Sequence, residues 1–337
     1  MAGNHFGIDI GEEHIKIGFI EQKKDKIEIL SYGYESILPT FYTNPNKQTA
    51  EEQAKIIASL HEKLNLSASK AHIVIPDFYT YSQLLIMPDL PEEQLVKSIK
   101  LQADEFIPLP ISQVYIDIEI ISKLQNGKLL LLFVASKKNI VDHIYNTVQL
   151  AGFEPETLEN ELASIGRFVS EFFKFIHEPS LIFNLGYSGS SIYVVNPQFP
   201  FFQIIRTSRI GYDVILRDLK LNSSLGDKSA EALKTIGLST KGSININNII
   251  YPLLAELFGE MEKTILLSKE RYGISIKHIY LMNNDYKIGW LIESVQNKLM
   301  LPTQTIPLST VLIPNQISQT FSQTLSSTLA VIATQIR

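Results

Sequence analysis

Two short segments of this chain carry residues that could hold a phosphate group. The sequence GIDIG occupies residues 7–11 and is followed by Lys16, and the sequence NLG occupies residues 184–186. A tight glycine turn presents backbone N–H groups to an anion, and a carboxylate two residues before it can hold a hydrated Mg²⁺ ion. Asp9 supplies such a carboxylate in the first segment, and Asn184 supplies an amide at the same place in the second. Together the segments predict a phosphate clamp.

The elements that must position these residues repeat along the chain at an offset of 175 residues, which carries Asp9 onto Asn184. Alternating apolar residues predict a strand, a glycine turn, a strand, a turn and a strand over residues 6–29, and again over residues 181–204. Chance similarity between two β-meanders is the alternative explanation. An offset matched across three strands favours duplication, and therefore two homologous α/β domains.

The segment between the two repeats has a different pattern. A strand at residues 79–87 precedes a helix with apolar residues on one face, and prolines end that helix. Strands at residues 114–122 and 129–135 meet at Asn126-Gly127, which is typical of a hairpin turn, and another helix ends at Gly152. This order predicts a small α+β subdomain. The segment 108–111 either simply ends the helix or lines a peptide groove.

These motifs resemble those of the actin, hexokinase and Hsp70 superfamily, whose domains have a ribonuclease H-like fold. GIDIG with Lys16 resembles its first phosphate motif, NLG its second, and AEALK at residues 230–234 its nucleoside-contacting helix. The resemblance implies two actin-like domains around a nucleotide cleft for ATP, with Asp9 holding Mg²⁺ through a bound water. The candidate nucleotide-site residues that it implies are Asp9, Gly11, Lys16, Asn184, Gly186, Gly211, Glu231, Lys234, Asn283 and Asn284.

Nearly the whole chain is similar to the PilM family of type IV pilus assembly proteins, which is related to the division protein FtsA. The similarity is carried, in order and spacing, by IP at 75–76, MP at 87–88, EEQL at 92–95, FIPLP at 106–110, AGF at 151–153, Glu161, the helix start at 260–264 and the closing segment 330–337. It implies an α/β fold in which an α+β subdomain, shared by PilM and FtsA, is inserted into the first actin-like domain. The predicted parts are 1–78 with 155–179 as the first domain, 317–337 as a helix packing back on it, 79–154 as the inserted subdomain and 180–316 as the second domain.

Four departures from the superfamily pattern predict a degraded nucleotide site. Glu12 and Glu13 stand where a Ser or Thr usually meets phosphate, and a carboxylate about 4 Å from a phosphate oxygen costs on the order of several kcal/mol. Asn184 replaces an aspartate, Asn283-Asn284 replaces a Gly-Gly pair, and Gly211-Tyr212 replaces another. We expect weak or absent ATP binding and no appreciable hydrolysis. In the alternative, the two glutamates point away from the cleft, and a working ATP site regulates partner binding.

By resemblance, PilM proteins bind the cytosolic N-terminal tail of the membrane protein PilN, in a groove between the first domain and the inserted subdomain. They also contact the pilus assembly ATPases. The same role is expected here, for a cytoplasmic scaffold held at the inner membrane through its partners in a pilus, competence or secretion system. The alternatives are a sugar-kinase-type enzyme, which needs the missing hydroxyl and Gly-Gly motifs, and an FtsA-like division protein. The latter needs a basic, aromatic C-terminal amphipathic helix, whereas residues 325–337 contain one Arg and no aromatic residue.

The composition argues against several other kinds of partner and site. The 337 residues carry a net charge of −5 without a concentrated Lys/Arg block, so no nucleic-acid partner is expected. The absence of cysteine excludes disulfides and Cys-ligated metals. The mid-chain apolar run 129–135 is far shorter than the roughly 18 residues of a membrane helix, and no apolar signal region precedes the first strand, so direct membrane insertion is not expected. The histidines show no i,i+4 pair, which predicts isolated side chains rather than metal ligands: His5, His14, His61, His72, His143, His177 and His278.

Overall fold

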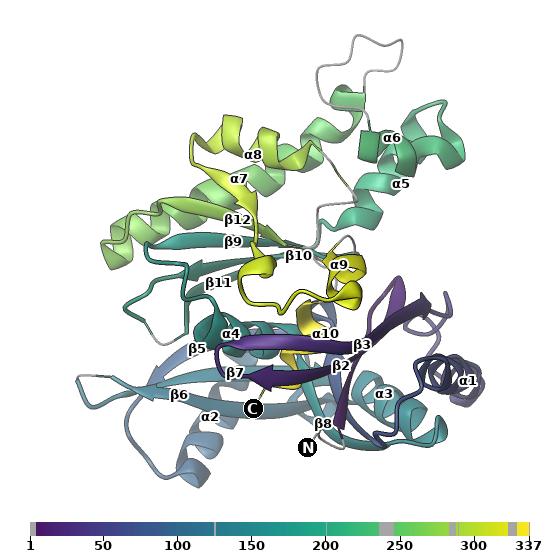
Figure 1. Ribbon diagram of the computed structural model, residues 1–337. Coiled ribbons are helices and arrows are strands. Elements are labelled where there is room, and N and C mark those ends of the chain that lie inside the picture. Colours follow the sequence, from purple (N-terminus) through teal and green to yellow (C-terminus); the bar gives the residue numbers. More distant parts are fainter. Residues whose placement is uncertain are drawn as a thin grey trace. The chain divides into compact units, whose positions relative to one another are not determined.

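The computed structural model describes residues 5–124, 126–199, 201–235, 246–282, 288, 290–322 and 329–336 (Figure 1). The chain divides into two compact units. The first unit comprises Met1–Phe173, Val311–Ser318 and Thr328–Arg337, and the second comprises Lys174–Thr310 and Gln319–Ser327.

A five-stranded mixed sheet in the order β3-β2-β1-β4-β8 forms the centre of the first unit. Its strands are β1 (His5–Ile10), β2 (His14–Lys23), β3 (Lys26–Ser36), β4 (Lys70–Ile75) and β8 (Glu154–Asn160). The first three form an antiparallel meander, whereas β4 pairs in parallel with both β1 and β8. Phe6, Ile8 and Ile10 alternate along β1 and are fully buried in one core, as the period of two predicts.

Two helices pack on this apolar core. Helix α1 (Lys47–Lys63) begins at Asn46, whose side chain accepts a hydrogen bond from the N–H of Thr49 in a capping box. Helix α3 (Lys138–Leu150) packs against α1 and β8, and Ile140, Ile144 and Val148 join the same core. The boundaries 79–154 of the inserted subdomain stay a prediction. Helix α3 lies within these boundaries, yet its apolar residues belong to the core of the five-stranded sheet.

The C-terminal end of the chain packs on the glycines of β1 and β2. Helix α10 (Leu329–Ala333) contacts both strands and α4 (Glu161–Phe172), and it lies beside the meander in Figure 1. A Cβ atom on Gly7 would lie 2.0 Å from the carbonyl oxygen of Val331, so the helix backbone rests directly on the strand. Helix α9 (Gln316–Ser322) precedes α10.

A three-stranded antiparallel sheet, β5-β7-β6, stands beside the five-stranded sheet in the first unit. Its strands are β5 (Thr80–Met87), β6 (Val114–Lys123) and β7 (Leu129–Lys137), with helix α2 (Glu92–Phe106) and the 3-10 turns η1 (Asp77–Tyr79) and η2 (Ile111–Gln113). In the β6–β7 turn Gly127 has a φ of 76°, a conformation that glycine adopts without strain. The strands and helix predicted for the inserted α+β subdomain are therefore confirmed.

The second unit repeats the sheet of the first. Its order, β11-β10-β9-β12-β13, has the same succession of antiparallel and parallel pairs as β3-β2-β1-β4-β8, which confirms the predicted duplication. The strands are β9 (Ser180–Leu185), β10 (Ser190–Val195), β11 (Phe202–Ser208), β12 (His278–Met282) and β13 (Thr303–Thr305). The helices are α5 (Tyr212–Asn222), α6 (Ser229–Thr235), α7 (Ile246–Tyr272) and α8 (Leu291–Leu299), with 3-10 turns η3 (Gly226–Lys228) and η4 (Leu308–Thr310).

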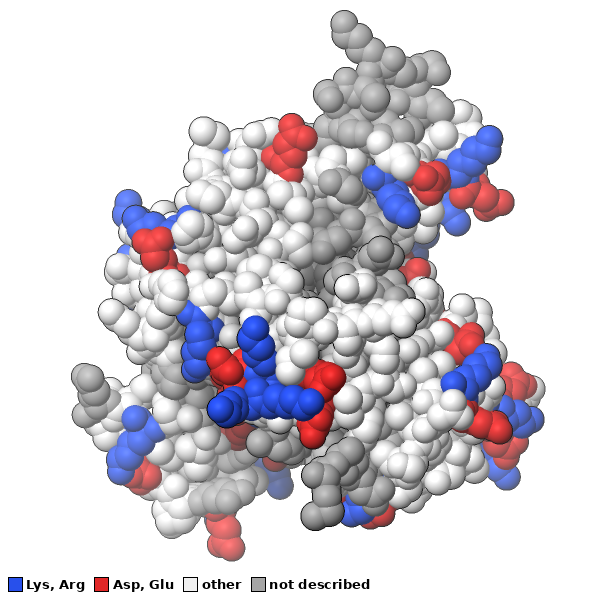
Figure 2. All heavy atoms as spheres, in the orientation of Figure 1, with Lys and Arg blue, Asp and Glu red and all other residues white. Residues whose placement is uncertain are grey.

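The surface carries charges of both signs. On the face shown in Figure 2, lysine and arginine side chains lie next to aspartate and glutamate side chains. Among the described residues, no helix combines the length and apolar character needed to cross a bilayer.

Candidate functional site

The first phosphate-like motif forms a compact turn between β1 and β2. Asp9 and Lys16 face each other across the two strands, and the Lys16 Nζ atom lies 2.8 Å from Asp9 Oδ2. Both side chains are largely buried, at 9% and 13% exposed. The Gly11 N–H donates to the carbonyl oxygen of His14 at 3.1 Å, and a Cβ on Gly11 would lie 2.8 Å from that oxygen. The structure thus brings Asp9, Gly11 and Lys16 together, with the carboxylate already paired to the ammonium group.

A tyrosine that sequence reasoning missed lies beside this turn. The Tyr42 hydroxyl donates to the carbonyl oxygen of Ile10, and the ring stacks on Tyr79 with centroids 4.3 Å apart. Burial raises the pKa of the Tyr42 hydroxyl well above its usual value, and Tyr79 and the negative charges of Asp9 and Glu12 raise it further. The Tyr42 hydroxyl therefore stays neutral and can donate a hydrogen bond. The negative charges of Glu12 and Asp9 both act on this hydroxyl, at the end of β1. Tyr42 follows no motif or period, so the sequence held no signal for it.

The second motif has the same backbone but different chemistry. Asn184, which is 2% exposed, faces Ser191 across β9 and β10, at the positions that Asp9 and Lys16 occupy in the first unit. Two neutral side chains thus replace an ion pair. The Tyr212 N–H donates to the carbonyl oxygen of Gly186 at 3.0 Å, and a Cβ on Gly211 would lie 2.1 Å from the carbonyl oxygen of Tyr187. Because Gly186 and Gly211 lack a side chain, the start of α5 can pack directly against the turn between β9 and β10.

Asp213 places a carboxyl group in the first turn of α5. Burial raises its pKa, and this effect exceeds the opposing effects of the Val214 N–H, the Arg217 charge and its own backbone N–H. The backbone N–H of Asp213 donates to the carbonyl oxygen of Tyr187 at 3.0 Å. An acid in the first helical turn is an ordinary helix-start signal, and sequence reasoning passed over it.

The remaining predicted nucleotide-site residues are less closely grouped. Glu231 and Lys234 are both exposed on α6, which packs against α5 and η3. Asn283 and Asn284 lie outside the described residues. Asp9, Gly11 and Lys16 belong to the first unit, and the other described candidates belong to the second. Each unit therefore contributes its own set of described candidates, and we call these two sets the nucleotide half-sites.

A groove of about 530 Å³ lies within the first unit, between β6 and β8; we call it the β6–β8 groove. Both strands are edge strands, because β6 ends the order β5-β7-β6 and β8 ends the order β3-β2-β1-β4-β8. Apolar side chains from four elements line the groove: Ile75, Ile118, Leu132, Val134 and Leu158. The sequence predicted no strand at residues 154–160, so it gave no sign that β8 forms one wall of the groove.

Acidic side chains outnumber basic ones among the residues that line the β6–β8 groove. Arg167 lines it, but its Nη2 atom lies 2.8 and 2.7 Å from the two carboxylate oxygens of Glu159, and its Nε–H donates to the carbonyl oxygen of Ile336 at 2.7 Å. Asp117 and Glu119 line the same groove and are exposed on β6. The accessible charge contributed by these residues is therefore acidic.

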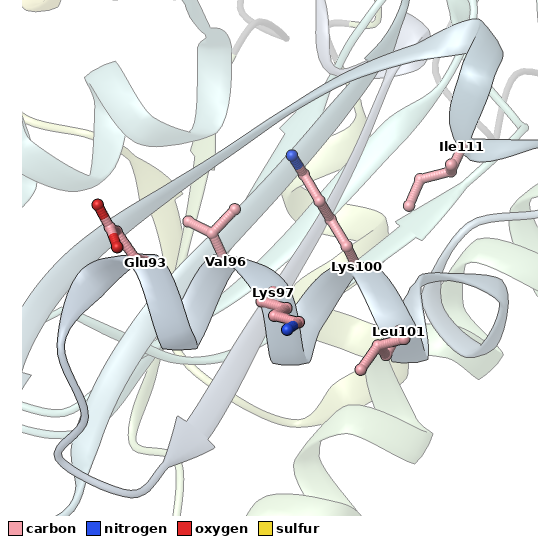
Figure 3. A pocket seen from close by; sticks show the side chains of 6 residues that line it. All are labelled: Glu93, Val96, Lys97, Lys100, Leu101 and Ile111. Atoms are coloured by element: carbon pink, nitrogen blue, oxygen red, sulfur yellow. The ribbon is translucent and has the colours of Figure 1, made fainter.

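A second, shallower hollow of about 700 Å³ lies along α2 (Figure 3). Ile111 reaches from η2 toward the C-terminal half of the helix, on the side of Lys100 and Leu101 (Figure 3). Leu101 is 80% exposed. The segment 108–111 thus follows the end of the helix, and its Ile111 lines this hollow. That the segment lines a peptide groove stays a prediction.

Two histidines predicted to be isolated lie together. The rings of His5 in β1 and His72 in β4 stack with centroids 5.0 Å apart and an interplanar angle of 12°. Glu156 in β8 contacts His5 and lies 3.8 Å from the Nε2 atom of His72. The prediction was wrong for this pair because strand register, not sequence spacing, brings them together.

Known structures share this architecture. A solved PilM–PilN type IV pilus biogenesis complex matches with a TM-score of 0.80 and 16% sequence identity, covering 100% of this chain and 100% of that chain. The ethanolamine utilization protein EutJ from Carboxydothermus hydrogenoformans matches with a TM-score of 0.51 and 12% identity, covering 98% of this chain and 88% of that chain. With the duplicated sheets, these matches establish the predicted actin-like two-domain fold.

The sequence comparison extends over nearly the whole chain. The profile of the family described as type IV pilus assembly protein PilM matches residues 7–320, which span both repeats and the three-stranded sheet between them. This chain therefore belongs to the PilM family of type IV pilus assembly proteins.

Proposed function

We propose that this protein is a cytoplasmic scaffold of a type IV pilus machine, or of a related competence or secretion system. In this proposal it captures the cytosolic N-terminal tail of a PilN-like inner-membrane protein in the β6–β8 groove, and it also contacts the assembly ATPases. Family membership and the fold shared with a PilM–PilN complex support the proposal. The observation that carries it is an acidic groove with apolar walls between two sheet edges.

An extended tail suits this groove for two reasons. Among the described residues β6 pairs with β7 alone, so one side of its backbone is available for main-chain hydrogen bonds to an added strand. Apolar walls formed by residues such as Val134 and Leu158 would receive alternate side chains of the tail. The carboxylates of Asp117 and Glu119 favour lysine or arginine in the tail.

Reversing the charge of the rim should weaken capture of the tail. We expect the double variant Asp117→Lys/Glu119→Lys to bind a synthetic tail peptide of the PilN-like partner at least tenfold less tightly, or by about 1.4 kcal/mol. Fluorescence polarisation at two salt concentrations measures the affinity, because screening should reduce the difference at high salt. Glu270→Lys, an exposed reversal on α7, is the matched control. Equal affinities for the double variant and the unaltered protein would remove the groove from the proposal.

We also propose that the nucleotide half-sites are degenerate and that the protein is not an enzyme. Lys16 neutralises Asp9, and Glu12 adds negative charge to the same turn. In the second unit the positions of Asp9 and Lys16 are taken by Asn184 and Ser191, which carry no charge to organise Mg²⁺. The alternative function, nucleotide-regulated partner binding, requires ATP to displace the Asp9–Lys16 pair.

Millimolar ATP with Mg²⁺ is therefore expected to shift the thermal unfolding midpoint by less than about 1 °C. A ligand at a hundred times its Kd adds about 2.7 kcal/mol, which would shift the midpoint by several degrees. Differential scanning fluorimetry measures the shift, with ADP and Asp9→Ala in parallel. A shift of several degrees that disappears in Asp9→Ala would establish a working nucleotide site instead, and leave the tail-binding proposal standing.

A further inference from the structure

We infer that His5, His72 and Glu156 form a binding site for Zn²⁺, separate from the nucleotide half-sites and independent of the proposed function. The three residues come from β1, β4 and β8, which are neighbours in the five-stranded sheet. One donor atom from each lies within 4.8 Å of the other two.

Strand register explains why these side chains share one face. β1 and β4 run in parallel with His5 opposite Lys70 and Gly7 opposite His72, so the two histidines lie two positions apart on the same side. The pairing of β4 with β8 shifts between Ala71 and His72 and leaves Glu156 as an extra residue in β8. Such a bulge reorients the side chain that it carries, and here it brings Glu156 to the histidines.

The donor atoms converge on one point. Glu156 Oε2 contacts His5 Nδ1 and lies 3.8 Å from His72 Nε2. The other carboxylate oxygen, Oε1, accepts a hydrogen bond from Lys70 Nζ at 3.3 Å, so the lysine is bound on the other oxygen. The Nδ1 atom of His72 lies 2.8 Å from Thr157 Oγ1, which fixes the ring with Nε2 turned toward Glu156. When one ring nitrogen of a histidine binds a metal ion, the other nitrogen usually makes a hydrogen bond that orients the ring.

Two imidazole nitrogens and one carboxylate oxygen are the donor set that zinc accepts, with water at a fourth position. Zinc bonds of about 2.0–2.2 Å place tetrahedral donors roughly 3.3 Å apart. The His72–Glu156 separation of 3.8 Å must shorten by about half an ångström and the closer His5–Glu156 contact must lengthen, and both changes call for rotation of the partly exposed Glu156 side chain. A bound ion would tie β1 and β8 to the central strand β4.

The test is calorimetric titration of the untagged, EDTA-treated full chain with ZnCl₂ at pH 7.5, with MgCl₂ as a second ligand. We expect one Zn²⁺ per chain at micromolar Kd or tighter, and no binding of Mg²⁺. His5→Ala and Glu156→Gln should each weaken the Zn²⁺ affinity at least tenfold. His278→Ala is the matched control, because His278 also pairs with a single glutamate, Glu178, at 3.1 Å.

Co²⁺ in place of Zn²⁺ gives an independent readout, since tetrahedral Co²⁺ with these donors absorbs visible light. The absorption should be present in the unaltered protein and in His278→Ala, and lost in His5→Ala. Far-UV circular dichroism of the metal-free variants checks that they are folded. Zn²⁺ binding that is absent at 100 µM ZnCl₂, or that is unchanged in both His5→Ala and Glu156→Gln, would overturn the inference.

Discussion

Replacing Gly7 with alanine is expected to lower the free energy of unfolding of the first unit by about 3 kcal/mol. The added Cβ would lie 2.0 Å from the carbonyl oxygen of Val331 and 2.7 Å from the Nε2 atom of Gln335. The first of these atoms belongs to the backbone of α10, so no side-chain rotation can relieve the contact. Urea unfolding followed by far-UV circular dichroism measures the loss, and hydrogen exchange should show reduced protection in residues 329–336.

Gly18 supplies the matched control for this prediction. It faces Gly7 in the pairing of β1 with β2 and lies under the same helix. The three atoms nearest to a Cβ on Gly18 would all belong to the side chains of Val331 and Ile332, at 3.4 Å and beyond. Gly18→Ala should therefore change the unfolding free energy by less than about 1 kcal/mol. Equal losses in the two variants would show that packing of α10 does not set the cost.

Arg167→Met is expected to cost about 2 kcal/mol of stability. Arg167 and Glu159 are only 21% and 13% exposed, and removing one partner of such a pair leaves a poorly solvated carboxylate. The carbonyl oxygen of Ile336 loses its donor as well. Methionine keeps much of the apolar stem, so the change isolates the charged contacts. Urea unfolding of the variant measures the cost.

A double-mutant cycle separates the ion pair from these other contacts. Glu159→Gln removes the charge while keeping an oxygen that can accept from Thr334 Oγ1, which lies 2.6 Å from Glu159 Oε1. In the double variant Arg167→Met/Glu159→Gln the loss should be smaller than the sum of the two single losses by at least about 1 kcal/mol. Additive losses would mean that the pair contributes no coupling energy.

The repeated motif could be predicted from sequence because its signals are local. Alternating apolar residues and a glycine turn specify each meander, and the 175-residue offset that joins Asp9 to Asn184 also joins Lys16 to Ser191. The structure places both pairs directly across their strands. The hairpin at Gly127 was likewise predictable, because an Asn-Gly turn specifies it within a few residues.

Features that depend on distant pairing gave no such signal. Strand β8, with the sequence EPETLEN, contains a proline, three glutamates and one leucine, so nothing marks it as a strand until β4 pairs with it. The residues that line the β6–β8 groove and the bulge at Glu156 were consequently not predictable, although the resemblance to the PilM family implied a groove between the first domain and the inserted subdomain. Helix α7 spans Ile246–Tyr272 with Pro252 inside it, a position at which proline disfavours a helix, so its extent also depends on tertiary packing. Sequence alone therefore predicted that Asp9, Gly11 and Lys16 lie together, and it gave neither the residues of the groove nor the histidine cluster.

The position of α10 has a consequence for how the protein is made. The ribosome produces β1 and β2 first, but the helix that covers their glycines follows roughly 300 residues later, which takes roughly 15–60 s at bacterial translation rates. During that interval the face of the sheet that receives Leu329, Val331 and Ile332, all fully or nearly fully buried in the finished protein, has no cover from them. The unit whose synthesis starts first is thus completed last. Until α10 emerges, the glycine-bearing face of β1 and β2 therefore lacks the helix that covers it in the finished protein.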